Sequence, residues 1–157
     1  MSSLNRLFWT FVSLLLIASA APSASAADLP ADLCSLLPAT VVTKALGDAY
    51  GEPVKSVAPR PYSNTVAGTD CTYQSKQHSL VFRIYVDPSA QVAKTLFAKL
   101  KLFLGAGSTA VAGVGEEAYL DTRHGVHVRK GKVRFYLDGG DTDQQRNDLA
   151  NGIAAQL

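Results

Sequence analysis

Residues 82–87 of the chain are Phe-Arg-Ile-Tyr-Val-Asp, and residues 133–138 are Val-Arg-Phe-Tyr-Leu-Asp. In both stretches apolar side chains alternate with arginine, tyrosine and aspartate, which is the two-residue period of a strand with one buried face. Each stretch comes before a segment with helical periodicity. The recurrence indicates either a weak internal duplication or two strands that converged on one pattern, and both interpretations predict strands packed against helices.

The first of these stretches belongs to a predicted hairpin. Residues 70–76 also alternate, and a short turn at Gln77-His78 joins them to the strand that ends at Asp87. The region from Gly47 to Gly68 has a broken pattern, which predicts a loop with one edge strand near residues 54–58. Three more strands are expected after a glycine-rich loop, at residues 117–122, 126–130 and 132–138.

Three segments have the spacing of amphipathic helices. The clearest follows Asp87 and Pro88, which suit an N-cap and a first helical residue, and it ends at Gly105. Its apolar stripe comprises Val92, Leu96, Phe97, Leu100, Phe103 and Leu104. The other two helices are expected at residues 38–46 and from about residue 141 to 157, the last with Thr142 and Gln145 at capping-box spacing.

These elements define the predicted fold class. We expect an α+β domain in which an antiparallel sheet of about five strands packs against two or three helices. The chain has 157 residues, of which 47% are hydrophobic and 18% are charged. These values suit one globular domain and exclude disorder, collagen, coiled coil and a disulfide-dense miniprotein.

The N-terminal segment has the features of a secretory signal peptide. Arg6 precedes an uncharged apolar stretch from Leu7 to Ala20, and Ala24-Ser25-Ala26 forms an A-x-A cleavage site. The apolar stretch is shorter than the roughly 20 residues of a membrane span, although an uncleaved anchor is the alternative. We therefore predict a signal peptide at residues 1–26 and a single domain at residues 27–157, with no membrane span after cleavage and a periplasmic or secreted location.

Cys34 and Cys71 are the only two cysteines. In an oxidising compartment a pair of this kind favours a disulfide over a reactive thiol or a metal ligand. The formal net charge is only +2 before the predicted cleavage, which gives no drive toward nucleic acid.

Several short motifs carry a family resemblance. They are Cys34-Ser35-Leu36-Leu37, Ala45-Leu46-Gly47, Cys71-Thr72-Tyr73, Val114-Gly115-Glu116-Glu117-Ala118-Tyr119, Val128-Arg129-Lys130-Gly131 and the closing helix rich in leucine and alanine. The chain resembles small exported domains of unknown function that are common among actinobacterial lipoproteins. The resemblance implies a disulfide-tied α+β domain of the cell envelope, akin to extracellular sensor modules. Ala31-Asp32-Leu33 before Cys34 is not a lipobox, so this chain departs from the lipoprotein pattern.

No motif in the sequence indicates catalysis or a cofactor. Glu116 and Glu117 are adjacent at the entry of an expected strand, so they are expected to point to opposite faces and are poorly placed to act as a general acid and base on one bond. His124 and His127, with Asp121, resemble an H-x-x-H metal site, but Gly125 places them across a turn. His78 is expected to be an isolated polar residue of a turn. We predict no catalytic residue, no metal and no cofactor.

The strand alternation instead predicts a polar face. If the apolar residues of the strands point to the core, a set of arginine, tyrosine and histidine side chains must point away from it. These candidate binding residues are Arg83, Tyr85, Tyr119, His127, Arg129, Arg134 and Tyr136. Tyrosine and arginine are enriched in binding sites, although both also occur on solvated strands. The face is expected to be exposed.

The sequence therefore favours a non-catalytic exported binding or sensor-like module. Its partner would be an envelope protein, a glycan or a small ligand, with carboxylate or sugar groups as suitable chemistry for arginine and tyrosine. Two other classes of function are open. One is a secreted or periplasmic enzyme inhibitor, and the other is a small hydrolase whose residues converge from loops.

Overall fold

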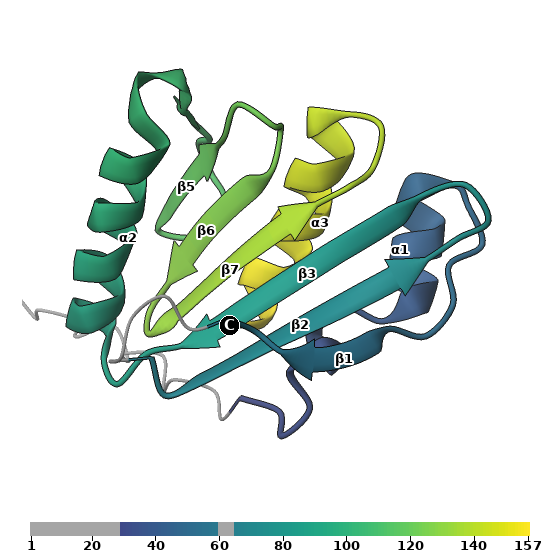
Figure 1. The fold of residues 1–157 in the computed structure, drawn as a ribbon, viewed down its shortest axis with the longest axis horizontal. Coiled ribbons are helices and arrows are strands. Elements are labelled where there is room, and N and C mark those ends of the chain that lie inside the picture. Colours follow the sequence, from purple (N-terminus) through teal and green to yellow (C-terminus); the bar gives the residue numbers. More distant parts are fainter. Residues whose placement is uncertain (1–28, 60–64) are drawn as a thin grey trace, which may run out of the picture.

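The structure is a computed structural model that describes residues 29–59 and 65–157. The predicted signal peptide at residues 1–26 lies outside the described residues. The described residues form one seven-stranded antiparallel sheet in the order β1-β2-β3-β7-β6-β5-β4 (Figure 1). The strands are β1 (Val54–Val57), β2 (Ala67–Gln74), β3 (Ser79–Val86), β4 (Thr109–Ala110), β5 (Glu117–Leu120), β6 (Val126–Lys130) and β7 (Val133–Asp138).

The α+β class with an antiparallel sheet is confirmed, and β3 and β7 are the two stretches with the shared pattern. They lie side by side at the centre of the sheet, with Phe82 opposite Leu137 and Ile84 opposite Phe135. The sheet has seven strands where about five were expected. The two strands beyond five are β1, which lies at the edge where a strand near residues 54–58 was expected, and β4, which has only two residues and is too short to show an alternating pattern in the sequence.

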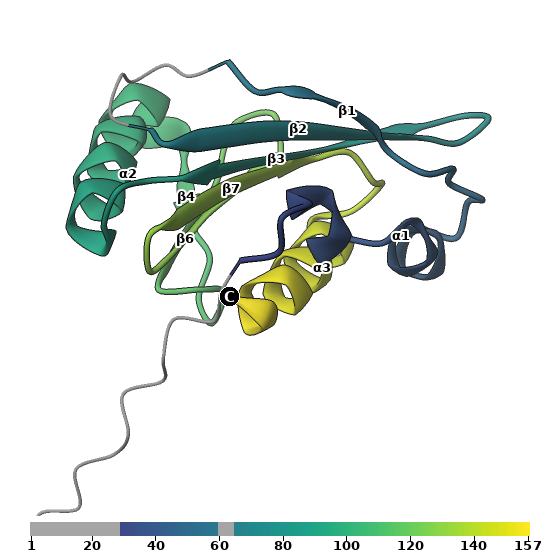
Figure 2. The same ribbon diagram turned by 90° about the horizontal axis from the view of Figure 1, so that it is seen from below.

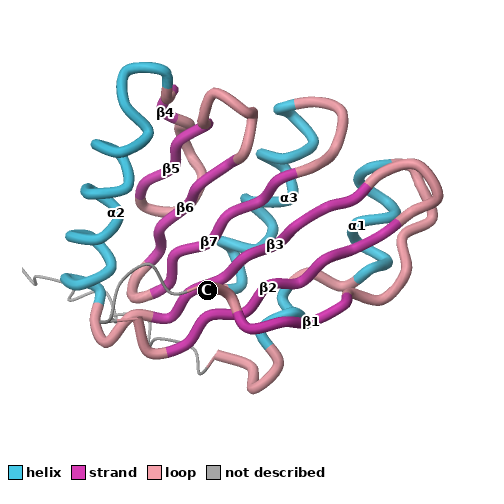
Figure 3. Tube along the Cα trace, in the orientation of Figure 1, coloured by secondary structure: helices cyan, strands magenta, loops and turns pink. Residues whose placement is uncertain are grey.

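Among the described residues there are three α-helices, α1 (Ala39–Leu46), α2 (Ala90–Leu104) and α3 (Asp143–Gln156), and two short 3₁₀ segments, η1 (Leu33–Leu36) and η2 (Gly105–Gly107). Figure 3 shows how the helices flank the strands. Thr142 and Gln145 form the expected capping box of α3. The expected start of α2 is wrong in detail, because the hydroxyl of Ser89, and not the carboxylate of Asp87, accepts the capping hydrogen bond, from Val92 N.

The two faces of the sheet are covered differently (Figure 2). η1, α1 and α3 lie on one face, and α2 lies on the other. The first face carries the main apolar core, in which Phe82, Ile84 and Phe135 of the strands pack with Leu149 and Ile153 of α3. Phe82 and Phe135 meet edge to face with ring centroids 6.0 Å apart. This core accounts for the apolar half of the strand alternation.

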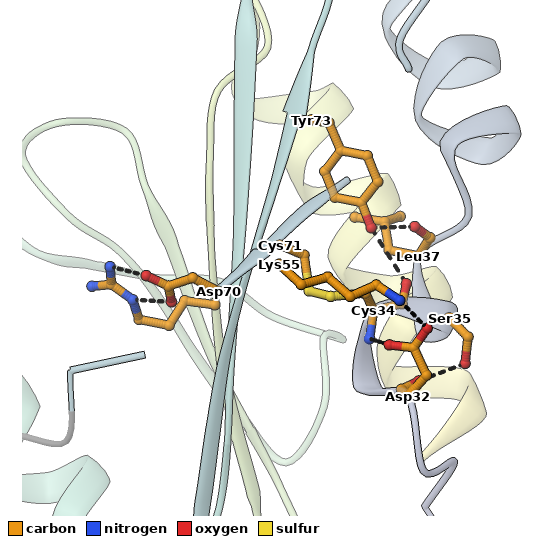
Figure 4. Close-up of a disulfide and its surroundings, with 9 residues drawn as sticks. Asp32, Cys34, Ser35, Leu37, Lys55, Asp70, Cys71 and Tyr73 are labelled. Atoms are coloured by element: carbon orange, nitrogen blue, oxygen red, sulfur yellow. Dashed lines mark hydrogen bonds and ion pairs between the residues drawn. A yellow bond between two sulfur atoms is a disulfide. The ribbon is translucent and has the colours of Figure 1, made fainter. Parts of the chain in front are cut away.

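A disulfide joins η1 to β2 (Figure 4). Cys34 and Cys71 are bonded, with their Cα atoms 5.8 Å apart, as the cysteine pair predicted. Next to it, the buried Tyr73 hydroxyl donates to the carbonyl oxygens of Cys34 and Leu37. Burial raises the pKa of Tyr73. The bond and this hydroxyl together hold the N-terminal turn against the sheet.

Replacing both cysteines, as Cys34→Ala with Cys71→Ala, is expected to lower the free energy of unfolding by about 3 to 4 kcal/mol. The bond closes a span of 37 residues, and cross-linking such a span restricts the unfolded chain. Guanidinium chloride unfolding without reductant measures the loss. Tyr73→Phe is the matched control, since it keeps the bond and removes a buried hydroxyl, which costs about 1 to 3 kcal/mol. Unchanged stability of the double variant would contradict the prediction.

His78 is not the isolated turn residue that the sequence suggested. Its Nδ1 lies 2.7 Å from Asp48 Oδ2, and its Nε2 lies 4.0 Å from Asp141 Oδ1. The hydrogen bond with Asp48 raises the pKa of His78 above its ordinary value of 6.5 and lowers the pKa of Asp48 below 3.8. The imidazole thus connects the turn after α1, the β2–β3 turn and the segment before α3.

The contribution of His78 to stability is therefore expected to depend on pH. It is fully present below about pH 6.5, where the imidazole is charged in the folded and the unfolded chain, and it is lost as the pH rises through the raised pKa of His78. It also fades in acid as Asp48 is protonated. Urea unfolding of the wild type and of His78→Gln at pH 5, 7 and 9 should show a difference that shrinks with rising pH. Lys76→Gln, in the same turn, should give a difference that does not change with pH.

Candidate functional site

The seven candidate binding residues lie on the face of the sheet opposite the main core, as the strand alternation predicted. Arg83 of β3 is paired with Tyr136 of β7, and Tyr85 of β3 with Arg134 of β7. In the neighbouring strands, His127 is paired with Tyr119 on one side and with Tyr136 on the other, and Arg129 is paired with Glu117 and Arg134. The side chains therefore form one continuous set across four strands.

The expectation that this face is open to solvent is wrong. Tyr85 is only 9% exposed, Arg129 5% and Arg134 4%. The α2 helix covers the β5, β6 and β7 side of the face, where Tyr119 stacks on Phe97 of α2 with ring centroids 5.5 Å apart. On the β3 side, the hydroxyl of Tyr85 donates to the carbonyl oxygen of Pro59 over 2.9 Å. Strand periodicity gives the direction of a side chain but not what packs on top of it.

A buried ion pair lies at the start of α2. Arg134 donates to Asp87 through Nε at 2.6 Å and Nη2 at 3.0 Å, and the hydroxyl of Thr65 also donates to Asp87 at 3.2 Å. All three side chains are buried. Asp87 directly follows β3 and is three residues before α2, so this forked contact ties the entry of the helix to β7. It also explains why Asp87 does not cap α2.

Arg129 forms ion pairs with both Glu116 and Glu117. Its Nη1 donates to Glu116 and its Nη2 donates to Glu117, the latter at 2.9 Å. The pKa of Glu116 is lowered, first by the backbone N–H of Gly131 and then by Arg129. The expectation that the two glutamates point apart is therefore wrong, because both carboxylates reach one guanidinium and Glu116 lies before β5, outside its two-residue period. The lowered pKa keeps Glu116 ionised, which is unsuited to the role of a general acid.

Glycines make room for two tyrosine rings of this face. A side chain at Gly68 would lie 3.0 Å from the ring of Tyr85, and one at Gly125 would lie 2.3 Å from the ring of Tyr136. Tyr136 is also stacked on His127, with ring centroids 4.4 Å apart. The guanidinium of Arg134 lies 5.1 Å from the centre of the Tyr85 ring. The two tyrosines are therefore held in fixed positions over the backbone.

His127 is bound by Asp121 and not by a second histidine. Its Nε2 lies 2.9 Å from Asp121 Oδ2, and both side chains are largely buried. Burial lowers the pKa of His127 even though Asp121 opposes that effect. His124 instead has its Nδ1 3.1 Å from Asp143 Oδ1. Within residues 29–59 and 65–157, no group of three or more histidine, cysteine or acidic side chains could hold a metal ion.

A groove of about 730 Å³ lies on this face beside the C-terminal half of α2. Its floor is formed by strand residues, one wall by the C-terminal half of α2, and its other edge by the β5–β6 turn. The lining residues are Arg83, Tyr85, Leu100, Phe103, Leu104, Asp121, Thr122, Arg123, His127, Arg134 and Tyr136. The volume lies within the range of small-molecule sites, roughly 300 to 1,000 Å³.

Five of the seven candidates line this groove, and two do not. Arg129 forms ion pairs with Glu116 and Glu117. Tyr119 stacks on Phe97, and the Nζ of Lys101 lies 4.7 Å from the centre of the Tyr119 ring. Sequence reasoning missed the α2 wall and Arg123 of the turn. It placed Phe103 in the buried stripe, but Phe103 is 86% exposed. The apolar stripe of α2 includes residues that pack on the sheet, such as Leu96 and Phe97, and residues that face the groove, such as Phe103. The sequence pattern does not separate the two groups, because it does not show how α2 packs.

Comparison with known proteins does not place the chain in a family. No protein-family model matches it, and no curated protein matches it significantly. The part of the chain that the structure describes contains no helix long and apolar enough to cross a membrane. The fold and the groove therefore carry the functional argument.

Arg134→Met is expected to lower the free energy of unfolding by about 3 to 5 kcal/mol, because it leaves Asp87 buried without its partner. Replacing both residues, as Arg134→Met with Asp87→Leu, should cost less than the sum of the two single changes. Arg83→Met is the matched control. Its partner Asp70 is less buried than Asp87, so that loss should be about 1 kcal/mol or less. Urea unfolding measures all four variants, and equal losses for Arg134→Met and Arg83→Met would contradict the prediction.

Proposed function

We propose that the protein is an exported, non-catalytic binding module that takes its ligand in the groove beside α2. The observation that carries this proposal is the groove itself, in which two arginines, two tyrosines and a histidine predicted as binding residues meet an apolar helix wall. Ligand sites commonly combine a mostly apolar lining with a few fixed polar groups. The rings of Tyr85 and Tyr136 lie against glycine backbone, which favours a site that is already formed before binding.

The polar contacts of the site favour binding over catalysis. Asp121 accepts hydrogen bonds from the backbone N–H groups of Arg123 and Gly125 besides its contact with His127. Asp87 is fully engaged by Arg134 and Thr65. Carboxylates held in this way organise the site and are poor candidates for proton transfer to a substrate.

Export is proposed on two grounds. The N-terminal segment has the pattern of a signal peptide, and the Cys34–Cys71 disulfide suits an oxidising compartment. The resemblance to exported envelope domains is consistent with this location. Such a module would act in the periplasm or outside the cell.

A small hydrolase is the second candidate, and the Asp121–His127 pair is the observation that favours it. A carboxylate that fixes an imidazole is part of many hydrolytic sites, and the lowered pKa keeps His127 neutral and able to accept a proton. In this chain the imidazole stacks on Tyr136, and its contacts serve to position that ring.

Binding can be mapped by amide chemical shifts. We expect an extract of envelope small molecules, added to the ¹⁵N-labelled protein, to shift the amides of Tyr85, Phe103, Arg123 and Tyr136. Shifts confined to the apolar groove between α1 and α3 that includes Val41 and Gly152 would contradict the proposal. Chemical conversion of an extract component that His127→Gln abolishes would favour the hydrolase.

A further inference from the structure

The apolar wall of the groove ends in an aromatic ring, Phe103, that is almost fully exposed. Leu102 and Phe103, in the last turn of α2, are 82% and 86% exposed respectively. They are adjacent in sequence but point differently, because successive residues of a helix are turned by about 100°. Phe103 lines the groove and Leu102 does not. An aromatic ring on the edge of a groove is a surface that a flat apolar ligand can cover.

The lining of the groove has an excess of positive charge. The described lining residues include three arginines, Arg83, Arg123 and Arg134, but one carboxylate, Asp121. Arg83 and Arg134 are neutralised by Asp70 and Asp87, which lie outside the lining. Arg123 differs from both, since it forms no ion pair with any carboxylate of the described residues.

The turn that carries Arg123 is held in place by its own hydrogen bonds. Asp121 Oδ1 accepts from the N–H groups of Arg123 at 2.8 Å and Gly125 at 2.9 Å, and the N–H of His124 donates to the carbonyl oxygen of Asp121 at 3.0 Å. His124 has a left-handed backbone, with φ of 66°. The backbone of Arg123 is thus fixed on the edge of the groove, while its side chain is exposed. Arg123 also borders a second hollow, which Asp138 and Asp143 line, so the test below must show that it acts in the groove.

We propose that the groove binds a small aromatic or otherwise flat apolar molecule that carries one anionic group, such as a carboxylate or sulfonate. This inference rests on the proposed function and specifies the ligand. The apolar body lies against Phe103 and Leu100 of α2 and the ring of Tyr136, and the anion pairs with Arg123. Arginine suits this role because its guanidinium matches the geometry of an oxyanion.

Two fluorescent probes separate the apolar and the anionic parts of the proposal. 8-Anilinonaphthalene-1-sulfonate carries a sulfonate on an aromatic body, and N-phenyl-1-naphthylamine has the same body without the charge. We expect saturable binding of the sulfonate to one site of the folded protein and a rise in its melting temperature. The uncharged probe should bind about five- to tenfold more weakly, the effect of losing roughly one charge-assisted contact in a partly solvated site.

Matched variants assign each part to a residue. Arg123→Gln should weaken the sulfonate about five- to tenfold and leave the uncharged probe unchanged. Lys99→Gln is its control, since it removes an exposed cation of α2 that does not line the groove. Phe103→Ala should weaken both probes, whereas Leu102→Ala, at a residue of nearly equal exposure, should weaken neither. None of these four side chains is buried, so the melting temperatures without probe should stay nearly constant.

Three results would overturn the inference, and each would identify the part that is wrong. Equal affinity for both probes with no effect of Arg123→Gln removes the anionic part. Equal losses in Leu102→Ala and Phe103→Ala show attachment to exposed apolar surface and not to the groove. If neither probe binds but an extract component shifts the groove amides, the ligand class is wrong while the proposed binding function stands.

Discussion

The buried ion pair between Asp87 and Arg134 fixes the position of α2 on the sheet. Burying a charge costs free energy unless an opposite charge is close to it, so loss of either partner leaves the other charge buried and unpaired. Because Asp87 connects β3 to α2 and Arg134 belongs to β7, the contact holds the start of the helix over the strands. The groove wall that α2 forms depends on that position.

The two faces of the sheet are stabilised by different physics. The face toward α1 and α3 is an apolar core, in which Phe82, Ile84 and Phe135 are almost completely removed from water. The face toward α2 is a network of ion pairs and rings in which Arg83, Arg129 and Arg134 each pair with a carboxylate. The groove lies at the end of this face that α2 covers least. Buried polar groups that satisfy one another hold their side chains in defined positions. That is the property a preformed binding surface requires.

The candidate site was partly predictable. Alternation in β3, β6 and β7 was enough to select Arg83, Tyr85, His127, Arg134 and Tyr136, because a strand with one apolar face has only one alternative direction for its other side chains. The same logic could not show that Arg134 is buried or that Arg129 is used by Glu116 and Glu117, since both outcomes depend on partners distant in the sequence. Phe103 and Arg123 had no signal of their own. Their place in the site follows from the fold, which puts α2 on one side of the groove and the β5–β6 turn on the other.

The sequence by itself determined the α+β class, the pairing of Cys34 with Cys71, the central hairpin and the capping of α3. Those features follow from local periodicity, turn residues and a cysteine count that leaves one partner. The tertiary structure alone decided which face α2 covers, that Asp87 forms an ion pair and does not cap the helix, and where a groove remains. These outcomes depend on how segments distant in the sequence pack together on the sheet. An amphipathic pattern shows that a helix has an apolar side but not which face of the sheet it covers.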